Sequence, residues 1–354
     1  MSETISRFIE AQNNLVVQHS DFSLRALFDM AEENSIDLTP KYQRRDRWNK
    51  EKQSALIESF ILNVPVPPVY LSEDDFGKYS VIDGKQRITA IRDFLSGELR
   101  LTGLTKFPEL EGCHFSDLPP QLRNALSVRP YIRVITLLRQ TNPDLKYEVF
   151  LRLNTGGEKL LSQEIRNVAF SGPLNDLLLT LSANDFLRSQ MKIKNESSTA
   201  YRNMDDVEHV LRFFTIADRW QQIGQVLSQE MDRYMQENRF PSSRALNDMA
   251  QRFEFSLNAC EAIWGNKAFY KPQAGGWRSQ FISPLYDAEM VAVLDFTDAQ
   301  ISSIRHNRTR FLNAFSRVFQ DDTEFEKAVT RATNNPNSIR RRISTVRSLL
   351  SQYC

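Results

Sequence analysis

The sequence is poor in the residue types that build disulfide frameworks and metal sites. Its 354 residues include only three cysteines and four histidines. The cysteines are odd in number and far apart, and Cys113–His114 is the one place where the two residue types are adjacent. Zinc ligands and paired disulfides need closer and more regular spacing. We therefore expect neither a disulfide framework nor a structural zinc site.

Several other features are scarce, and each scarcity excludes a class of protein. Twelve glycines and 14 prolines are too few for a low-complexity chain. A formal net charge of +1 excludes a uniformly basic DNA binder, although it permits a local basic surface. No apolar run approaches the ~20 residues of a membrane helix, and the first residues do not resemble a signal peptide. We expect a cytoplasmic protein with no membrane partner.

The length and the hydrophobic patterning predict two domains of different character. At ~100–200 residues per domain, two is the natural expectation. Residues 1–170 mix strand-like runs with helices that begin after the capping residues Ser23 and Asn49. From residue 171 onward, amphipathic helices follow one another. We predict an α+β fold, with a helical domain at 171–354. Strands are expected at 36–40, 69–71, 79–82 and 132–138, and the later helices near 204–214, 244–264, 287–294, 299–319 and 338–351.

The strongest local signal is the run Asp83-Gly84-Lys85-Gln86-Arg87, which follows an apolar strand and precedes a helix. Glycine permits a tight turn, and the N–H groups at a helix start favour a bound anion. Lys85 and Arg87 add positive charge where a phosphate would sit. The pattern predicts a phosphate site; the alternative is an ordinary helix start with surface bases.

Two further segments combine polar and aromatic residues. In the first, basic residues alternate with aromatic ones, as in sites that bind nucleotides or single strands. The alternative is a charged loop that Trp48 anchors. In the second, the predicted turn Asn154-Thr-Gly-Gly157 lies between helices, and Ser162 is predicted to cap the second helix. The first segment comprises Tyr42, Gln43, Arg44, Arg45, Arg47 and Trp48.

Taken together, these segments resemble the GmrSD-type restriction-endonuclease N-terminal family, which has a ParB/sulfiredoxin-like fold. The resemblance covers roughly residues 20–215. It departs from the family pattern at Lys85, where glutamine is usual. The matching motifs, in order, are Tyr42-Gln43-Arg44, Trp48, Ile57-Glu58-Ser59, Pro65-Val-Pro67-Pro68, Asp83-Gly84-Lys85-Gln86-Arg87, Asn154-Thr-Gly156-Gly157 and Glu164-Ile-Arg166.

The resemblance implies an NTP-binding, NTP-hydrolysing module of anti-phage restriction. It assigns the nucleotide to the 83–87 loop, with Asp83, Gln86, Arg87 and Asn154 as the catalytic group. A looser analogy to ParB-type nucleotide clamps assigns Mg²⁺ to Asn154. The residues expected to bind the cofactor are Tyr42, Gln43, Arg44, Gly84, Lys85 and Arg87.

The paucity of histidine argues against an HNH-type nuclease in this chain. We therefore expect a stand-alone family member that acts with DNA, such as modified or phage DNA, and with a separate nuclease or other effector, either as a monomer or as a homo-oligomer. One alternative is a nuclease that binds metal through Asp83, Glu58 and Glu164. Another is a non-catalytic adaptor that binds DNA or protein.

Basic residues also gather near the C-terminus. Segment 301–354 holds ten basic and four acidic residues, with Arg340, Arg341 and Arg342 consecutive. Together with Arg45 and Arg47, these arginines are the predicted DNA contacts. The alternative is a solvated helix face.

Overall fold

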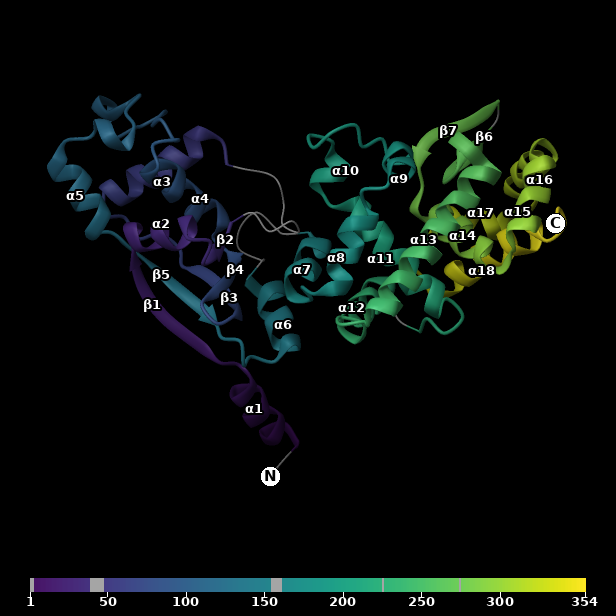
Figure 1. The fold of residues 1–354 in the computed structure, drawn as a ribbon, viewed down its shortest axis with the longest axis horizontal. Coiled ribbons are helices and arrows are strands. Elements are labelled where there is room, and N and C mark those ends of the chain that lie inside the picture. The colour runs from purple at the N-terminus through teal and green to yellow at the C-terminus, as the bar shows by residue number, and fades with distance from the viewer. Residues whose placement is uncertain (1–2, 39–47, 154–160, 225, 274) are drawn as a thin grey trace. The chain divides into compact units, whose positions relative to one another are not determined.

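The computed structural model describes residues 3–38, 48–153, 161–224, 226–273 and 275–354 (Figure 1). The chain divides into two compact units, Met1–Ala169 and Phe170–Cys354. The predicted α+β class is confirmed, because a mixed sheet with helices builds the first unit and helices dominate the second. Among the described residues, no helix is both long enough and apolar enough to cross a bilayer.

A five-stranded mixed sheet organises the N-terminal unit, in the order β1-β5-β3-β4-β2. The β1–β5 and β3–β4 pairs are antiparallel, whereas β5–β3 and β4–β2 are parallel. β3 is the central strand. The last residue of β4, Asp83, pairs with Tyr70 of β3, whereas the described residues of β2 pair with Tyr79 and Ser80 of β4. The strands are β1 (Val17–Ser23), β2 (Ile36–Asp37), β3 (Val69–Asp75), β4 (Lys78–Asp83) and β5 (Tyr131–Leu137).

Two hydrophobic clusters cover the two faces of this sheet. Successive strand residues point to opposite faces, so Val81 joins the larger cluster and Ile82 the smaller one. The larger cluster packs against α2, α3, α4 and α5, and the smaller one against α6 and α7. The helices of this unit are α1 (Glu3–Asn14), α2 (Leu24–Glu32), α3 (Lys50–Ile61), α4 (Lys85–Leu95), α5 (Pro120–Val128), α6 (Pro143–Leu153) and α7 (Ser162–Ala169), with 3-10 turns η1 (Pro108–Leu110) and η2 (Phe115–Asp117).

Side-chain caps fix the starts of two helices, as the sequence predicted. The Ser23 hydroxyl accepts the Ala26 N–H at 3.2 Å and begins α2. The Asn49 side-chain oxygen accepts the Lys52 N–H at 2.9 Å and begins α3. Each cap satisfies a backbone donor that has no partner inside its own helix.

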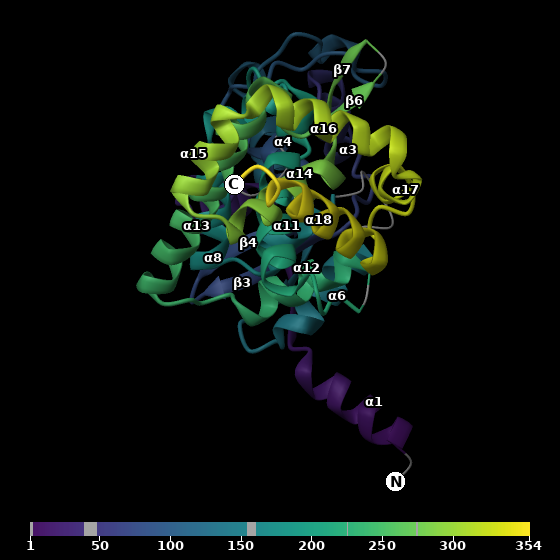
Figure 2. The ribbon, with the colours of Figure 1, turned by 90° about the vertical axis from the view of Figure 1, so that its right-hand side faces the viewer.

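The C-terminal unit is built around α14, whose residues from Pro284 to Ala292 are all buried. Helices α11, α13, α17 and α18 pack against it, as Figure 2 shows from the side. The helices are α8 (Pro173–Leu181), α9 (Asp185–Gln190), α10 (Thr199–Arg202), α11 (Asp205–Arg219), α12 (Leu227–Glu237), α13 (Ser243–Trp264), α14 (Ser283–Ala292), α15 (Asp298–His306), α16 (Arg308–Asp321), α17 (Thr323–Thr330) and α18 (Pro336–Leu350), with 3-10 turns η3 (Gly265–Lys267) and η4 (Val293–Asp295).

Two details of this unit differ from the sequence prediction. Strands β6 (Tyr270–Gln273) and β7 (Gly276–Phe281) form an antiparallel hairpin among the helices. The hairpin turns at Gly275, whose φ of 80° suits glycine. The single helix expected over 299–319 is two helices that meet at Asn307, because asparagine favours helix ends over helix interiors.

Candidate nucleotide-phosphate site

The turn between β4 and α4 can be made only by glycine at position 84. Gly84 has a φ of 99°, in the left-handed region that side chains disfavour. A Cβ atom added there would also lie 2.7 Å from the Cγ2 atom of Val69. Real Cβ atoms do not approach another heavy atom so closely, so two independent constraints require glycine. The turn therefore packs backbone without a side chain against Val69 and Arg87, at a buried position that directly precedes the first turn of α4.

The start of α4 is electrostatically suited to an anion. Gly84 is its N-cap, no side chain caps the first turn, and the first turn holds no acidic residue. Lys85 is the first helical residue. Most helices place acidic or hydroxyl side chains here, because the dipole leaves the N-terminus partially positive. In α4, glycine and lysine stand in their place, so the positive potential is not neutralised by its own first turn.

Arg87 braces this turn. Its Nη2 atom lies 2.6 Å from the Asp83 carboxylate, and its Nη1 atom donates to the Pro67 carbonyl at 3.0 Å. The Arg87 side chain is 11% exposed, whereas that of Asp83 is 51% exposed. The guanidinium thus ties the end of β4 to the segment that enters β3. A phosphate contact by Arg87, as the resemblance implies, would share or replace one of these two bonds.

Gln86 links the turn to the end of the Tyr-Gln-Arg segment. Its side-chain oxygen accepts the Trp48 backbone N–H at 3.0 Å. Two motifs that lie far apart in the sequence are therefore joined at the start of α4. The predicted contacts that precede Trp48 lie outside the described residues. These are Tyr42, Gln43, Arg44, Arg45 and Arg47.

Helices α6 and α7, which precede and follow the Asn154–Gly157 motif, also lie near this end of the sheet. Asn154, predicted to act in catalysis and to hold Mg²⁺, lies outside the described residues. Leu153, which precedes it at the end of α6, packs in the same hydrophobic cluster as Ile82 and Ile165. Ile82 directly precedes Asp83, and Ile165 belongs to α7. The two helices that flank the Asn154 turn therefore lie beside the last residues of β4.

Helix α7 carries fully buried polar residues, of which the sequence motifs include Arg166 but not Gln163 or Asn167. Gln163 and Asn167 are 1% and 0% exposed, and the Gln163 amide donates to the Asn167 side-chain oxygen at 2.8 Å. Arg166, 1% exposed, donates to Gln163 at 3.4 Å. Buried polar side chains of this kind are retained only where they are hydrogen-bonded. Their one signal in the sequence is the dense polar run after Leu161.

The three carboxylates proposed for a metal-dependent nuclease have other partners. Glu58 accepts N–H bonds from Thr105 at 2.9 Å, Lys106 at 2.6 Å and Phe107 at 3.1 Å. Burial raises the pKa of Glu58, but these hydrogen bonds outweigh burial and hold it below its usual value.

The other two carboxylates are engaged as well. Glu164 accepts the Leu161 N–H at 2.7 Å, and Asp83 pairs with Arg87. No group of three or more histidine, cysteine, aspartate or glutamate side chains suited to a metal occurs within the described ranges.

The predicted DNA contacts on α18 require a correction. Arg342 is 0% exposed and pairs with Asp287, which is also 0% exposed. Arg212 forms a second ion pair with the same Asp287 carboxylate. Arg342 therefore serves the core and cannot reach DNA in this fold. The cause is the helical period, because residue 342 falls on the face that carries Ile339 and Val346.

The neighbouring arginines differ from Arg342 and from each other. Arg340 donates to the carbonyls of Gln221 at 3.2 Å and Ile223 at 3.0 Å, so it fixes the loop before α12. Arg341 is half exposed and pairs with Asp322. The three consecutive arginines thus do not form one surface, and only Arg341 points largely to solvent.

Comparison with known proteins identifies the N-terminal unit. Residues 24–171 match the family described as the GmrSD restriction endonuclease, N-terminal domain. No curated protein and no solved structure gives a significant match. The ParB/sulfiredoxin-like topology thus rests on the sequence resemblance. The match begins at the first residue of α2 and ends just after α7, so it contains β2–β5 and the whole β4–α4 turn. Residues 24–171 form a GmrSD-type N-terminal domain.

Proposed function

We propose that this protein is a nucleotide-binding sensor or regulatory component of a restriction system, and that it acts on DNA with a separate effector. The β4–α4 turn is the proposed site for the phosphates of a nucleoside triphosphate. The observation that carries the proposal is the start of α4, where Gly84 leaves the first turn without a side-chain cap and Lys85 is the first helical residue. Close backbone approach at a helix start is the arrangement by which many proteins hold phosphate.

Each residue of the turn has a distinct role in this proposal. The first N–H groups of α4 and the Lys85 ammonium bind phosphate oxygens, because both are positive where a phosphate would approach. Arg87 and Asp83 hold the turn in shape through their ion pair and the bond to the Pro67 carbonyl. Arg87 is thus primarily a positioning residue, a narrower role than the sequence alone suggested.

A Mg²⁺ ion would accompany the triphosphate. The donor set of the described residues fits an ion carried mainly by the phosphates, since Asp83 is the one carboxylate at the turn and it is half exposed. When bound, Mg²⁺ would supply charge neutralisation of the phosphates. The role of Asn154 as a ligand remains part of the proposal.

Nucleotide occupancy would be sensed through Gln86. Its bond to the Trp48 N–H joins the start of α4 to the Tyr42–Arg47 segment. Bound phosphates that displace the first turn of α4 would change the strength of the hydrogen bond between Gln86 and the Trp48 N–H. A ligand shifts a conformational equilibrium only by its differential affinity for the two states. Hydrolysis would then remove the bias and reset the sensor.

The proposal is tested by titrating ATP, GTP, CTP and UTP into the protein by calorimetry, with phosphate release followed with and without DNA. We expect at least one nucleotide to bind. Lys85→Glu should abolish binding, and Lys85→Gln, which restores the usual family residue, should retain it. The matched control is Lys78→Glu, which makes the same charge change at the opposite end of β4.

The same preparations separate the alternatives. If none of the four nucleotides binds, the proposed site is wrong. Binding without phosphate release above background indicates a non-catalytic adaptor. Nicking of supercoiled plasmid by the protein alone with Mg²⁺ or Mn²⁺ indicates a nuclease. Our proposal predicts that the plasmid remains supercoiled.

A further inference from the structure

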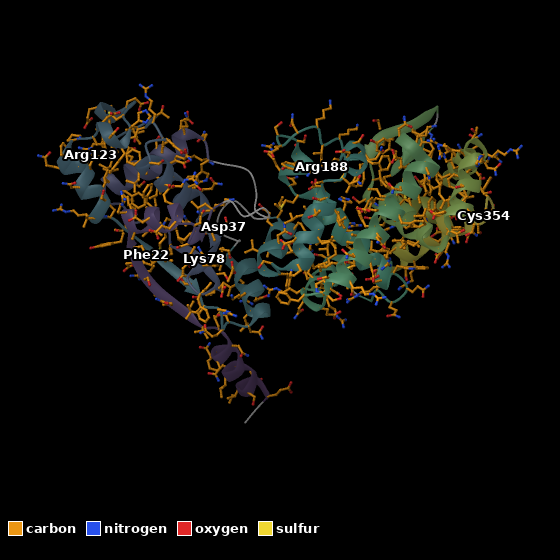
Figure 3. All side chains as sticks on the ribbon, in the orientation of Figure 1. Phe22, Asp37, Lys78, Arg123, Arg188 and Cys354 are labelled. Atoms are coloured by element: carbon orange, nitrogen blue, oxygen red, sulfur yellow. The ribbon has the colours of Figure 1, made fainter. Side chains whose placement is uncertain are left out.

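The C-terminal unit has a pocket of its own between α9 and α10. Its volume is about 510 Å³, within the range of sites that hold small ligands. Arg188, labelled in Figure 3, lies on α9 at this pocket. All its walls come from α9, the loop 191–198 and α10, so it is distinct from the phosphate turn of the N-terminal unit. The lining includes Arg188, Lys192, Lys194, Asp185, Glu196 and Tyr201.

Three cations from one short segment line this pocket. Arg188 is on α9, while Lys192 and Lys194 follow in the loop. Lys192 has a φ of 58°, unusual for lysine, and its ammonium donates to the Ser279 carbonyl on β7. Lys194 is exposed. The loop is therefore anchored to the hairpin at Lys192, and it presents Lys194 at the rim, where it can meet a phosphate.

The back wall is built from Tyr201 and Arg188. The guanidinium of Arg188 lies 5.2 Å from the centroid of the Tyr201 ring. Arg188 also donates to the Ser182 carbonyl at 3.1 Å and lies 3.5 Å from the Asp206 carboxylate. The Tyr201 hydroxyl donates to Glu196 at 3.1 Å. These bonds hold the wall in place before any ligand arrives, which lowers the entropic cost of binding.

Two carboxylates complete the lining and narrow the class of ligand. Asp185 and Glu196 would repel a simple anion, so inorganic phosphate alone fits poorly. Carboxylates accept hydrogen bonds from the exocyclic amino groups of nucleobases. A nucleotide uses both kinds of charged group, because it offers phosphate oxygens to lysine and an exocyclic amino group to a carboxylate.

We propose that the α9–α10 pocket binds one unpaired nucleotide of a DNA strand, with its phosphate at Lys194 and its base toward the carboxylates of Asp185 and Glu196. The proposal rests on the DNA-binding part of the proposed function and gives that part a location. It also replaces the α18 arginines, of which Arg342 is buried and Arg340 is engaged with carbonyl groups.

The test is fluorescence anisotropy of labelled single-stranded oligonucleotides, with no nucleotide triphosphate present. Two variants place an acidic side chain at exposed positions of the pocket lining, Lys194→Glu and Ser189→Glu. Each should weaken oligonucleotide binding about tenfold, the effect of 1.4 kcal/mol. The matched control is Lys327→Glu, an exposed lysine on α17 whose partner is Glu324. The control should bind within about twofold of wild type.

Base preference gives a second readout that simple loss of charge would not change. Oligo-dA and oligo-dC carry exocyclic amino groups and should bind more tightly than oligo-dT. Asp185→Asn should reduce this preference, whereas Lys194→Gln should weaken all three oligonucleotides alike. An unchanged preference in Asp185→Asn would overturn the placement of the base.

Other outcomes overturn the inference in distinguishable ways. If wild type binds oligonucleotides and both pocket variants bind equally well, the pocket assignment falls but DNA binding stands. If wild type binds none of the oligonucleotides, the DNA-binding part of the proposed function falls with it. If dAMP or dCMP binds the pocket as tightly as the oligonucleotide, the ligand is a free nucleotide rather than a DNA strand.

Discussion

Two arginine–aspartate pairs, one from each unit, differ in how far their carboxylates are exposed. In the N-terminal unit, Asp83 and Arg87 meet at the end of a strand, and the Asp83 side chain is 51% exposed. In the C-terminal unit, Asp287 is fully buried between Arg212 and Arg342. An exposed pair can exchange a partner for a ligand at little cost, whereas breaking a buried pair leaves an uncompensated charge. The exposure of the carboxylate, and not the number of arginines nearby, therefore distinguishes the candidate ligand site at Asp83 from the structural ion pairs at Asp287.

The largest effect should come from breaking the buried pair. Arg342→Ala would leave Asp287 with Arg212 alone and empty the space of the guanidinium. We expect it to lower the free energy of unfolding by about 3–5 kcal/mol. Arg341→Ala, one residue away and half exposed, should change it by less than about 1 kcal/mol. Urea denaturation measures both, and equal losses would contradict the contrast between buried and exposed arginines.

Protonation of a buried histidine should lower the free energy of unfolding of the C-terminal unit at a higher pH than protonation of its carboxylates does. Burial, with the nearby charge of Arg212, lowers the pKa of His209 to about 4. Neutral His209 donates from Nδ1 to the Asp205 carbonyl and accepts the Ser283 hydroxyl at Nε2, 2.8 Å away. As the pH falls from about 6.5 to 4, the unfolded chain takes up a proton that the native chain does not.

The stability that depends on neutral His209 should therefore be lost across that window, by a free energy on the order of 2–3 kcal/mol. Asp205 acts in the opposite direction, because burial raises its pKa to about 6. Denaturation of wild type and His209→Gln between pH 7 and 4 isolates the His209 contribution. The variant should lose less stability toward acid than wild type, because its side chain at position 209 does not titrate. Parallel profiles for the two proteins would show that His209 does not set the slope.

Glu58 should give a smaller effect in the N-terminal unit, at lower pH. Hydrogen bonds from the 105–107 loop lower the pKa of Glu58 against the opposing effect of burial. The stability it contributes is present above its unfolded pKa of about 4.3 and is lost as the pH falls through the lower folded value. At neutral pH, Glu58→Gln should cost about 1–2 kcal/mol, because it removes charge-assisted bonds. Exposed Glu98→Gln is the control, and an equal loss there would contradict this role.

The smallest effects are expected at the candidate phosphate turn. Arg87→Ala removes an ion pair with the half-exposed Asp83 carboxylate and one bond to the Pro67 carbonyl, so it should cost about 1 kcal/mol. Lys85→Gln should change the free energy of unfolding by less than about 0.5 kcal/mol. Thermal denaturation measures both variants. A loss at Arg87 as large as that at Arg342 would remove the distinction between the two units.

Local features of the fold could be predicted from the sequence, and distant partners could not. Ser23 and Asn49 cap their helices because the bonds span three residues, a distance that the sequence itself fixes. The turn at Gly84 was predictable for the same reason. The Arg87 bond to Pro67 and the Glu58 bonds to the 105–107 loop join segments 20 or more residues apart. Their geometry depends on how the strands pair, which no local pattern specifies.

The misassigned Arg342 also shows that distant partners cannot be predicted from the sequence. Three consecutive basic residues on a helix point in three directions, since each residue turns the helix by about 100°. Arg342 was predicted to face DNA but shares its face with Ile339 and Val346. Its partner Asp287 lies on α14, 55 residues earlier in the chain. A charge on the apolar side of an amphipathic helix signals a buried partner, but the sequence does not say which one.

The central claim is that the start of α4, directly after Gly84, holds the phosphates of a nucleotide. The most direct test is calorimetric nucleotide binding by Gly84→Ala beside Gly97→Ala. Both glycines have positive φ, 99° and 86°, but a Cβ at Gly97 meets no atom within 4 Å, whereas one at Gly84 meets Val69 at 2.7 Å. The account predicts that Gly84→Ala loses nucleotide binding and that Gly97→Ala retains it. Wild-type affinity in a folded Gly84→Ala protein would contradict it.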